Sequence, residues 1–187
     1  MIILDCETYK NYFLLSMIDT ISGKIRDFEL YDGQDFDSKT VAAILRKHTT
    51  LGFNSSNYDL PVIVAALRGD TNAQIKQLSD DIINAPKVWP VLKKHKIVIP
   101  QGFDHIDIMP IPIGQASLKI YGGRLHAPKM QELPIEPSAL ITPEQRNTLR
   151  LYCHNDLQVT AILYNELRPQ IALREQMGEQ YGLDLRS

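Results

Sequence analysis

The chain has 187 residues, of which 44% are hydrophobic and 22% charged, and its formal net charge is -2. Such a length and composition are typical of one soluble globular domain, residues 1–187. They exclude nucleic-acid binding through an overall basic charge, and the two cysteines exclude a disulfide framework.

The sequence pattern indicates neither export nor membrane insertion. Met1 leads directly into Ile2-Ile3-Leu4 without a basic start, so we expect no signal peptide. Cys6 and Cys153 are scattered, and a reducing compartment is the default for such thiols. No apolar run approaches the length of a membrane span. We therefore expect a cytoplasmic protein that does not bind membranes.

The first third of the chain has the pattern of strands. Residues 2–6 form a continuous apolar run, which is typical of a strand buried on both faces. Two further strands are predicted over 13–18 and 24–31, with Ser22-Gly23 as the turn between them. This spacing predicts two antiparallel hairpins.

Helices and short strands alternate after the hairpins. The spacing of Val41, Ile44 and Leu45 predicts a helix over 38–48, followed by a short strand over 50–53. Further helices are predicted over 58–68 and 72–83. The order of these elements favours an α/β layer domain.

The second half is interrupted by prolines. A strand is expected within 102–108, and a short helix over 117–121 that Gly122-Gly123 would stop. The last helix has a clear start, because Thr142 can cap it, Pro143 suits its first position and Gln145 completes a capping box. It should run through residue 165, and Pro169 should kink or break it. Trp89, the only tryptophan, is predicted to anchor the core, with a platform for base stacking as the alternative.

Asp5 and Glu7 stand two residues apart at the end of the first strand. Side chains alternate along a strand, so both carboxylates should point to one face, with Cys6 on the other. Two like charges on one face repel each other unless a cation neutralises them, and Mg²⁺ prefers oxygen ligands. The pair predicts a metal site, although a chance acidic pair at a strand edge explains it equally well.

Two more acidic elements follow. Asp59 begins a predicted helix, where the helix dipole alone would account for a carboxylate. Tyr152 and Asp156 are four residues apart and share one face of the last helix. An aspartate on a buried face needs a partner or a metal ion, and the alternative is a face turned aside that leaves Asp156 in water.

Together the three elements resemble a known family. Asp5-x-Glu7, Asn54-x-x-x-Tyr58-Asp59 and Tyr152-x-x-x-Asp156 are similar to the motifs of the 3′→5′ exonucleases named for their four acidic residues, in the tyrosine subclass. The segment 115–126 further resembles the proofreading domains of bacteriophage DNA polymerases. The resemblance implies a ribonuclease H-like α/β fold with a central mixed five-stranded sheet flanked by helices.

The resemblance also implies a mechanism. Asp5, Glu7, Asp59 and Asp156 would hold two divalent ions, Mg²⁺ or Mn²⁺, about 3.5–4 Å apart. One ion would activate the attacking water and the other would stabilise the leaving 3′ oxygen. Tyr152 would orient the water, since a phenol with a pKa near 10 is a poor general base.

The expected substrate is the 3′ end of single-stranded DNA. Its contacts are expected from residues beside the first and second motifs and from the basic segment around Lys119 and Arg124. For that segment, a solvated basic loop without a ligand is the alternative. The candidate residues are Thr8, Phe53, Asn54, Tyr58, Lys119 and Arg124.

The resemblance leaves the biological setting open in several respects. A polymerase domain in cis is expected if the chain belongs to a longer protein, and the chain itself should be a monomer, in the host cytoplasm if it comes from a bacteriophage. An exonuclease that trims RNA or oligonucleotides is one alternative. An inactive nucleic-acid-binding module on the same fold is another, although the complete set of acids disfavours it.

Overall fold

A mixed five-stranded sheet forms the centre of the molecule. The computed structural model describes residues 1–112, 114, 116–129 and 131–187. Two antiparallel hairpins build one side of the sheet and two short parallel strands extend the other, in the order β3-β2-β1-β4-β5. The strands are β1 (Ile2–Tyr9), β2 (Tyr12–Asp19), β3 (Ile25–Leu30), β4 (Thr50–Gly52) and β5 (His105–Asp107).

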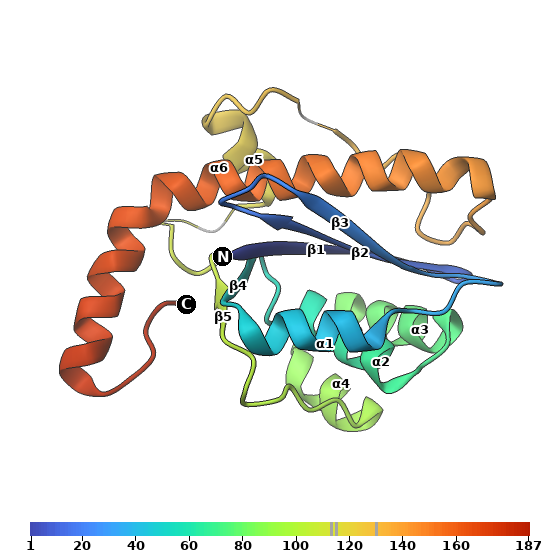
Figure 1. Cartoon of the computed structure of the whole chain (residues 1–187), viewed down its shortest axis with the longest axis horizontal. Helices are drawn as coiled ribbons and strands as arrows, with labels where there is room; N and C mark the ends of the chain where they lie inside the picture. Colours follow the sequence, from blue (N-terminus) through green and yellow to red (C-terminus); the bar gives the residue numbers. More distant parts are fainter. Residues whose placement is uncertain (113, 115, 130) are drawn as a thin grey trace.

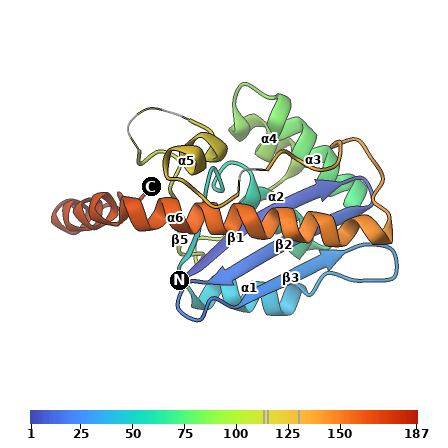
Figure 2. The same ribbon diagram turned by 90° about the horizontal axis from the view of Figure 1, so that it is seen from above.

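Helices cover both faces of this sheet (Figure 1). One face carries α1 (Ser38–Lys47), α2 (Asp59–Arg68), α3 (Asn72–Asn84) and α4 (Val88–His95). The opposite face carries α5 (Leu118–Arg124) and the long α6 (Pro143–Tyr181), which runs across the strands (Figure 2). The predicted α/β class, with a mixed five-stranded sheet flanked by helices, is confirmed.

The sheet register leaves the end of β1 open on one side. β1 pairs with β2 along its whole length, but it pairs with β4 only at Ile2 and Ile3. β1 continues to Tyr9, so Asp5 and Glu7 lie within the strand and not at its end as predicted, in the part that extends beyond its pairing with β4. β1 is the middle strand of the five.

Alternation along β1 divides the core into two layers. Leu4 and Cys6 pack with α1, α2 and α3, whereas Ile3 packs with α5 and α6. Tyr9 packs with Leu149 near the start of α6. The acidic side chains of β1 have the same parity as Ile3 and Tyr9, so they face α6.

Several predicted boundaries need correction. α4 was not predicted, because Pro86 and Pro90 disguise it, although a proline is tolerated in the first turn of a helix. α5 continues through Gly122-Gly123 to Arg124 instead of stopping there. A Cβ on Gly122 would lie 3.0 Å from Val159 Cγ1, so this glycine permits close packing of α5 on α6.

The last helix is longer than expected. Its capping box of Thr142 and Gln145 is present as predicted, but α6 continues to Tyr181 with Pro169 inside it. Figure 1 shows the helix changing direction in this region, so Pro169 kinks α6 without ending it. No helix in the described part of the chain combines the length and apolarity needed to cross a membrane.

Candidate metal centre

Three carboxylates from β1 and α6 meet over the part of the central strand that extends beyond β4. Asp5, Glu7 and Asp156 each offer an oxygen atom, and these oxygens lie within 4.8 Å of one another. We call this group the acidic cluster. It forms because α6 crosses the face to which Asp5 and Glu7 point, which places Asp156 opposite them. The predicted convergence of the first and third motifs is therefore present.

Asp59 lies beside the acidic cluster but is not among the three converging carboxylates. It is the first residue of α2 and only 4% exposed. Its charge raises the pKa of both Asp5 and Glu7, so it is electrostatically close to them. Its Oδ1 atom is buried and has no hydrogen-bond partner among the described residues. A buried oxygen of this kind is a ready ligand for a cation or for water.

Burial and mutual repulsion disfavour ionisation of these acids. Burial is the main cause of each shift and neighbouring carboxylates add to it: the pKa of Asp5 lies well above its usual range, and that of Glu7 rises to about 8. The pKa of Asp59 rises to about 7 and that of Asp156 also rises, in both cases chiefly through burial. Strongly perturbed carboxyl groups in one cluster are typical of functional sites. A divalent cation would relieve the repulsion.

Tyr152 stands one helical turn before Asp156 on α6. Burial and then the charge of Asp156 raise the pKa of its phenol, so the hydroxyl stays protonated at neutral pH. Interaction with this hydroxyl opposes the upward shift of the Asp156 pKa. Tyr152 can therefore donate a hydrogen bond at the acidic cluster, but it cannot accept a proton there as a base.

The buried thiol of Cys153 on α6 contacts Asp5. Cys153 Sγ donates to Asp5 Oδ2 at 3.2 Å and lies 3.5 Å from the Asp5 backbone oxygen. Cys153 is completely buried, and burial raises its pKa, so it remains a neutral donor. Sequence reasoning missed this contact, because the only signal for it was the position of Cys153 between Tyr152 and Asp156.

The loop between β4 and α2 is shaped by Asp107 at the end of β5. The Asp107 carboxylate accepts hydrogen bonds from the backbone N–H groups of Asn54, Ser56 and Met109 at 2.9–3.0 Å. Asn54 adopts a left-handed conformation with φ of 57°. This anchoring fixes the loop that leads into Asp59.

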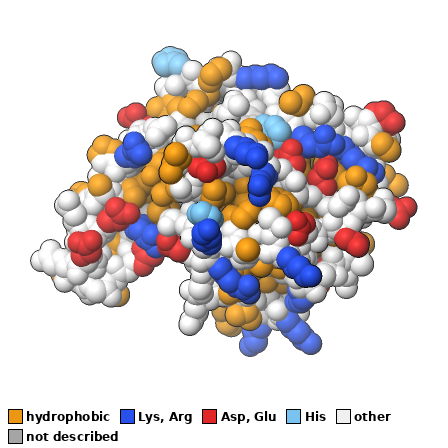
Figure 3. All heavy atoms as spheres, viewed as in Figure 1, with side chains coloured by type: hydrophobic (Ala, Val, Ile, Leu, Met, Phe, Trp, Pro, Cys, Tyr) orange, Lys and Arg blue, Asp and Glu red, His pale blue; other side chains and the backbone are white. Residues whose placement is uncertain are grey.

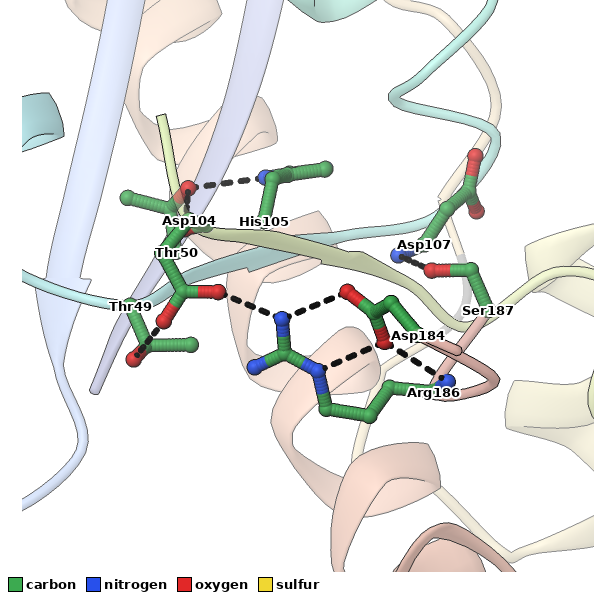
Figure 4. A network of polar contacts seen from close by, with 8 residues as sticks. All are labelled: Thr49, Thr50, Asp104, His105, Asp107, Asp184, Arg186 and Ser187. Carbon is green, nitrogen blue, oxygen red and sulfur yellow. Dashed lines mark hydrogen bonds and ion pairs between the residues drawn. The ribbon is translucent and has the colours of Figure 1, made fainter. Parts of the chain in front are cut away.

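His105 completes the same support. Its ring nitrogens lie 2.8 Å from Thr50 Oγ1 and 2.7 Å from Ser55 Oγ, and burial lowers its pKa to about 4. Figure 4 shows Asp107 and His105 in one network with the residues that pair β5 to the C-terminal segment. These contacts give His105 and Asp107 a structural role.

Thr8 and Tyr58, two of the predicted substrate contacts, belong to a ring of three hydroxyl groups. Thr8 Oγ1 lies 2.9 Å from Tyr58 OH and donates to Ser79 Oγ at 2.8 Å, and Tyr58 OH lies 2.9 Å from Ser79 Oγ. We call these three the hydroxyl ring. It joins β1, α2 and α3 beside the acids. Thr8 is only 7% exposed, so its side chain is committed to this ring. Sequence reasoning missed Ser79, for which the pattern gave no signal.

The other predicted contacts surround the site at different distances. Asn54 and Tyr58 line one groove. Phe53 and Arg124 both contact Tyr121, with a ring centroid distance of 6.0 Å and a guanidinium-to-centroid distance of 5.9 Å.

Lys119, another predicted contact, influences one of the acids electrostatically. It pairs with Glu132, and its charge lowers the pKa of Asp156, which places it near the acidic cluster. Gln115, which opens the resembling segment, lies outside the described residues.

The chain matches no protein-family model, no curated protein and no solved structure. Any assignment of function therefore depends on the residues and their geometry.

Proposed function

We propose that the chain is a 3′→5′ exonuclease that removes nucleotides from the 3′ ends of single-stranded DNA with two divalent ions, Mg²⁺ or Mn²⁺. The observation that carries this proposal is the convergence of Asp5, Glu7 and Asp156 within 4.8 Å. They meet on the central strand, and the order of these motifs along the chain is that of the family which the sequence resembles.

The donor set fits hard divalent cations. It offers only carboxylate oxygens at its centre, which Mg²⁺ and Mn²⁺ prefer. The buried Asp59 Oδ1, without a partner among the described residues, is available as a further ligand, directly or through water. Asp5, Glu7, Asp156 and Asp59 would hold the ions. Bound there, the ions would supply the Lewis acidity that activates water and stabilises charge on the leaving 3′ oxygen.

The residues of the chain have distinct roles in this proposal. The carboxylates would release their protons when cations bind, because burial and then mutual repulsion raise their pKa values and the charge of a cation offsets both. Tyr152 keeps its proton and orients the attacking water by a hydrogen bond. Cys153 fixes the rotamer of Asp5. The anchored loop from Asn54 to Asp59 places the fourth acid.

We extend the proposal to the fold and the setting. A ribonuclease H-like fold is supported by the mixed sheet with β1 in its middle and the first motif near the C-terminal end of that strand. Proofreading for a DNA polymerase, joined in cis in a longer protein, is supported by the resemblance of segment 115–126 to phage proofreading domains.

The direct test is the shortening of a single strand labelled at its 5′ end. We expect a ladder of products that shorten from the 3′ end in Mg²⁺ or Mn²⁺, and none in excess chelator. The double variant Asp5→Ala with Glu7→Ala should lose this activity while its circular dichroism spectrum and melting temperature show a folded protein. Asp32→Ala with Asp35→Ala removes equal charge from an exposed loop and should remain active.

The same assay decides between substrates. DNA and RNA of one sequence should be compared at equal concentration, and we expect DNA to be shortened faster. Preference for RNA would replace the proofreading assignment with RNA trimming. Full activity in the double variant, or activity in chelator, would contradict the metal-dependent mechanism.

A further inference from the structure

A groove runs beside the acidic site, between the α2 entry loop and the segment that joins α3 to α4. Its volume is about 520 Å³. Tyr58, which precedes Asp59 directly, lines one side of it, so the groove is continuous with the second motif. Its lining is polar on the loop side and largely apolar on the other: Asn54, Asn57, Tyr58, Ile82, Ile83, Ala85, Pro86, Lys87 and Val88.

Trp89 follows the groove in sequence and lies on the surface of α4. The sequence predicted a core anchor, but Trp89 is 70% exposed, so that prediction is wrong. It follows Val88, the last lining residue, in the first turn of α4. Lys93 Nζ lies 5.5 Å from the centroid of the Trp89 ring. An indole that remains this exposed offers a flat surface on which another aromatic ring can stack.

Two lysines belong to this region: Lys87 lines the groove and Lys93 lies over the indole. Lys87 and Lys93 are exposed, and neither forms an ion pair within the described part of the chain. Lys94, by contrast, is held by Asp81 at 2.6 Å. Figure 3 shows further basic side chains on the lower part of the molecule, on the side of the sheet that carries α1 to α4 in Figure 1. This end of the groove therefore attracts anions.

We propose that the groove and Trp89 form a binding site for single-stranded nucleic acid, in which a base stacks on the indole and backbone phosphates lie near Lys87 and Lys93. Exposed aromatic rings interleaved with unpaired cations are the elements that single-strand sites combine. The continuity of the groove with Asn54 and Tyr58 directs the strand toward the acids. The polarity of the strand, with its 3′ end at the acids, rests on the proposed function, whereas binding itself does not.

The sole tryptophan makes the stacking directly observable. Because Trp89 is the only tryptophan, all indole fluorescence of the chain comes from this site. The variant Asp5→Ala with Glu7→Ala should be titrated with an oligothymidylate of about 12 nucleotides, a length within the usual site size. We expect saturable quenching. Polyphosphate, an anion without bases, should leave the fluorescence unchanged at equal phosphate concentration.

A second measurement separates stacking from charge. The affinity of a labelled oligonucleotide, measured by fluorescence anisotropy, should fall about tenfold in Trp89→Ala, the effect expected for one lost base stack. Leu173→Ala, which also removes an exposed apolar side chain, should bind normally. Lys87→Glu and Lys93→Glu should each flatten the salt dependence of binding, whereas Lys47→Glu on α1 should not.

The outcomes distinguish this inference from the proposed function. Binding without quenching, equal affinity in Trp89→Ala, or equal quenching by polyphosphate would each overturn the nucleic-acid site, even if the chain shortens DNA. Absence of binding would overturn it as well. Quenching by the oligonucleotide in a protein that shortens no strand would leave the site standing and refute the exonuclease.

Discussion

Asp107 and Asp59 are buried to nearly the same degree, at 3% and 4% exposure, yet they differ in their hydrogen bonding. Asp107 accepts three backbone hydrogen bonds, whereas Asp59 leaves one oxygen without a partner among the described residues and faces two further acids. Burial alone thus does not distinguish a carboxylate whose oxygens are fully hydrogen-bonded from one that can still bind a ligand. The number of hydrogen-bond donors to the carboxylate makes this distinction, because a buried charge without partners is costly unless a cation or another group binds it.

The largest effect on stability should come from removing the satisfied carboxylate. Asp107→Ala leaves three backbone N–H groups without their acceptor, and we expect it to lower the free energy of unfolding by roughly 3 kcal/mol. Urea denaturation measures this loss. Asp104 lies just before Asp107 in the chain and pairs with Arg186, but it is exposed. Asp104→Ala should therefore lower the free energy of unfolding by less than about 1 kcal/mol. Equal losses in both variants would erase the distinction.

The metal-free protein should become less stable as pH rises, because of Glu7 and Asp59. The pKa of Glu7 is raised to about 8 and that of Asp59 to about 7, so the native state keeps protons that the unfolded chain has lost. Their stabilising contribution is complete below the ordinary carboxyl range and is lost as pH rises through 7 and 8. We expect the free energy of unfolding in chelator to fall on the order of 2 kcal/mol between pH 5 and 8.

Saturating Mg²⁺ should cancel that slope, because cations bind the deprotonated acids and stabilise the native state. The rise in melting temperature on adding Mg²⁺ should accordingly be greater at pH 8 than at pH 6. A metal-free protein whose stability is flat or rising over this range would show that the acids are not strained.

Neutralising one clustered acid should stabilise the metal-free fold. Glu7→Gln keeps the shape of the side chain and removes a repelling charge, so the free energy of unfolding in chelator at pH 8 should rise by about 1–2 kcal/mol. Glu29→Gln is the matched control, since Glu29 accepts hydrogen bonds from Arg150 and Tyr12. That variant should be destabilised. A loss of stability in both would place Glu7 in the same class as Asp107.

The smallest expected effect tests the residue that accompanies the acids without binding cations. Tyr152→Phe should slow turnover about tenfold, which corresponds to ~1.4 kcal/mol, if the phenol only orients water. The Mg²⁺ concentration at half-maximal melting shift should not change. An equal loss of Mg²⁺ affinity in Tyr152→Phe and Asp156→Ala would make the tyrosine part of the cation site instead.

Local periodicity accounts for what the sequence predicted well. Alternation in β1 is a property of neighbouring residues, so the shared face of Asp5 and Glu7 was accessible, as was the helical spacing of Tyr152 and Asp156. The capping box at Thr142 is equally local. The meeting of the two elements needed the crossing of α6 over β1, which only the family resemblance suggested.

Contacts between distant segments account for most of what it missed. The bond from Cys153 to Asp5 spans 148 residues and that from Thr8 to Ser79 spans 71, and no short pattern signals either. Trp89 was placed in the core by the general preference of large apolar residues for burial, but the α3–α4 connection holds it at the surface.

The hydroxyl ring has a consequence for how Tyr58 is held. When Thr8 donates to Ser79, Ser79 can donate to Tyr58 and Tyr58 to Thr8, so every oxygen gives one proton and receives one. Burial raises the pKa of Tyr58, and no member of the ring carries charge at neutral pH. The hydroxyl ring is thus electrically neutral. Its hydrogen bonds should hold Tyr58 between the acids and the groove whether the neighbouring carboxylates are protonated, ionised or bound to cations.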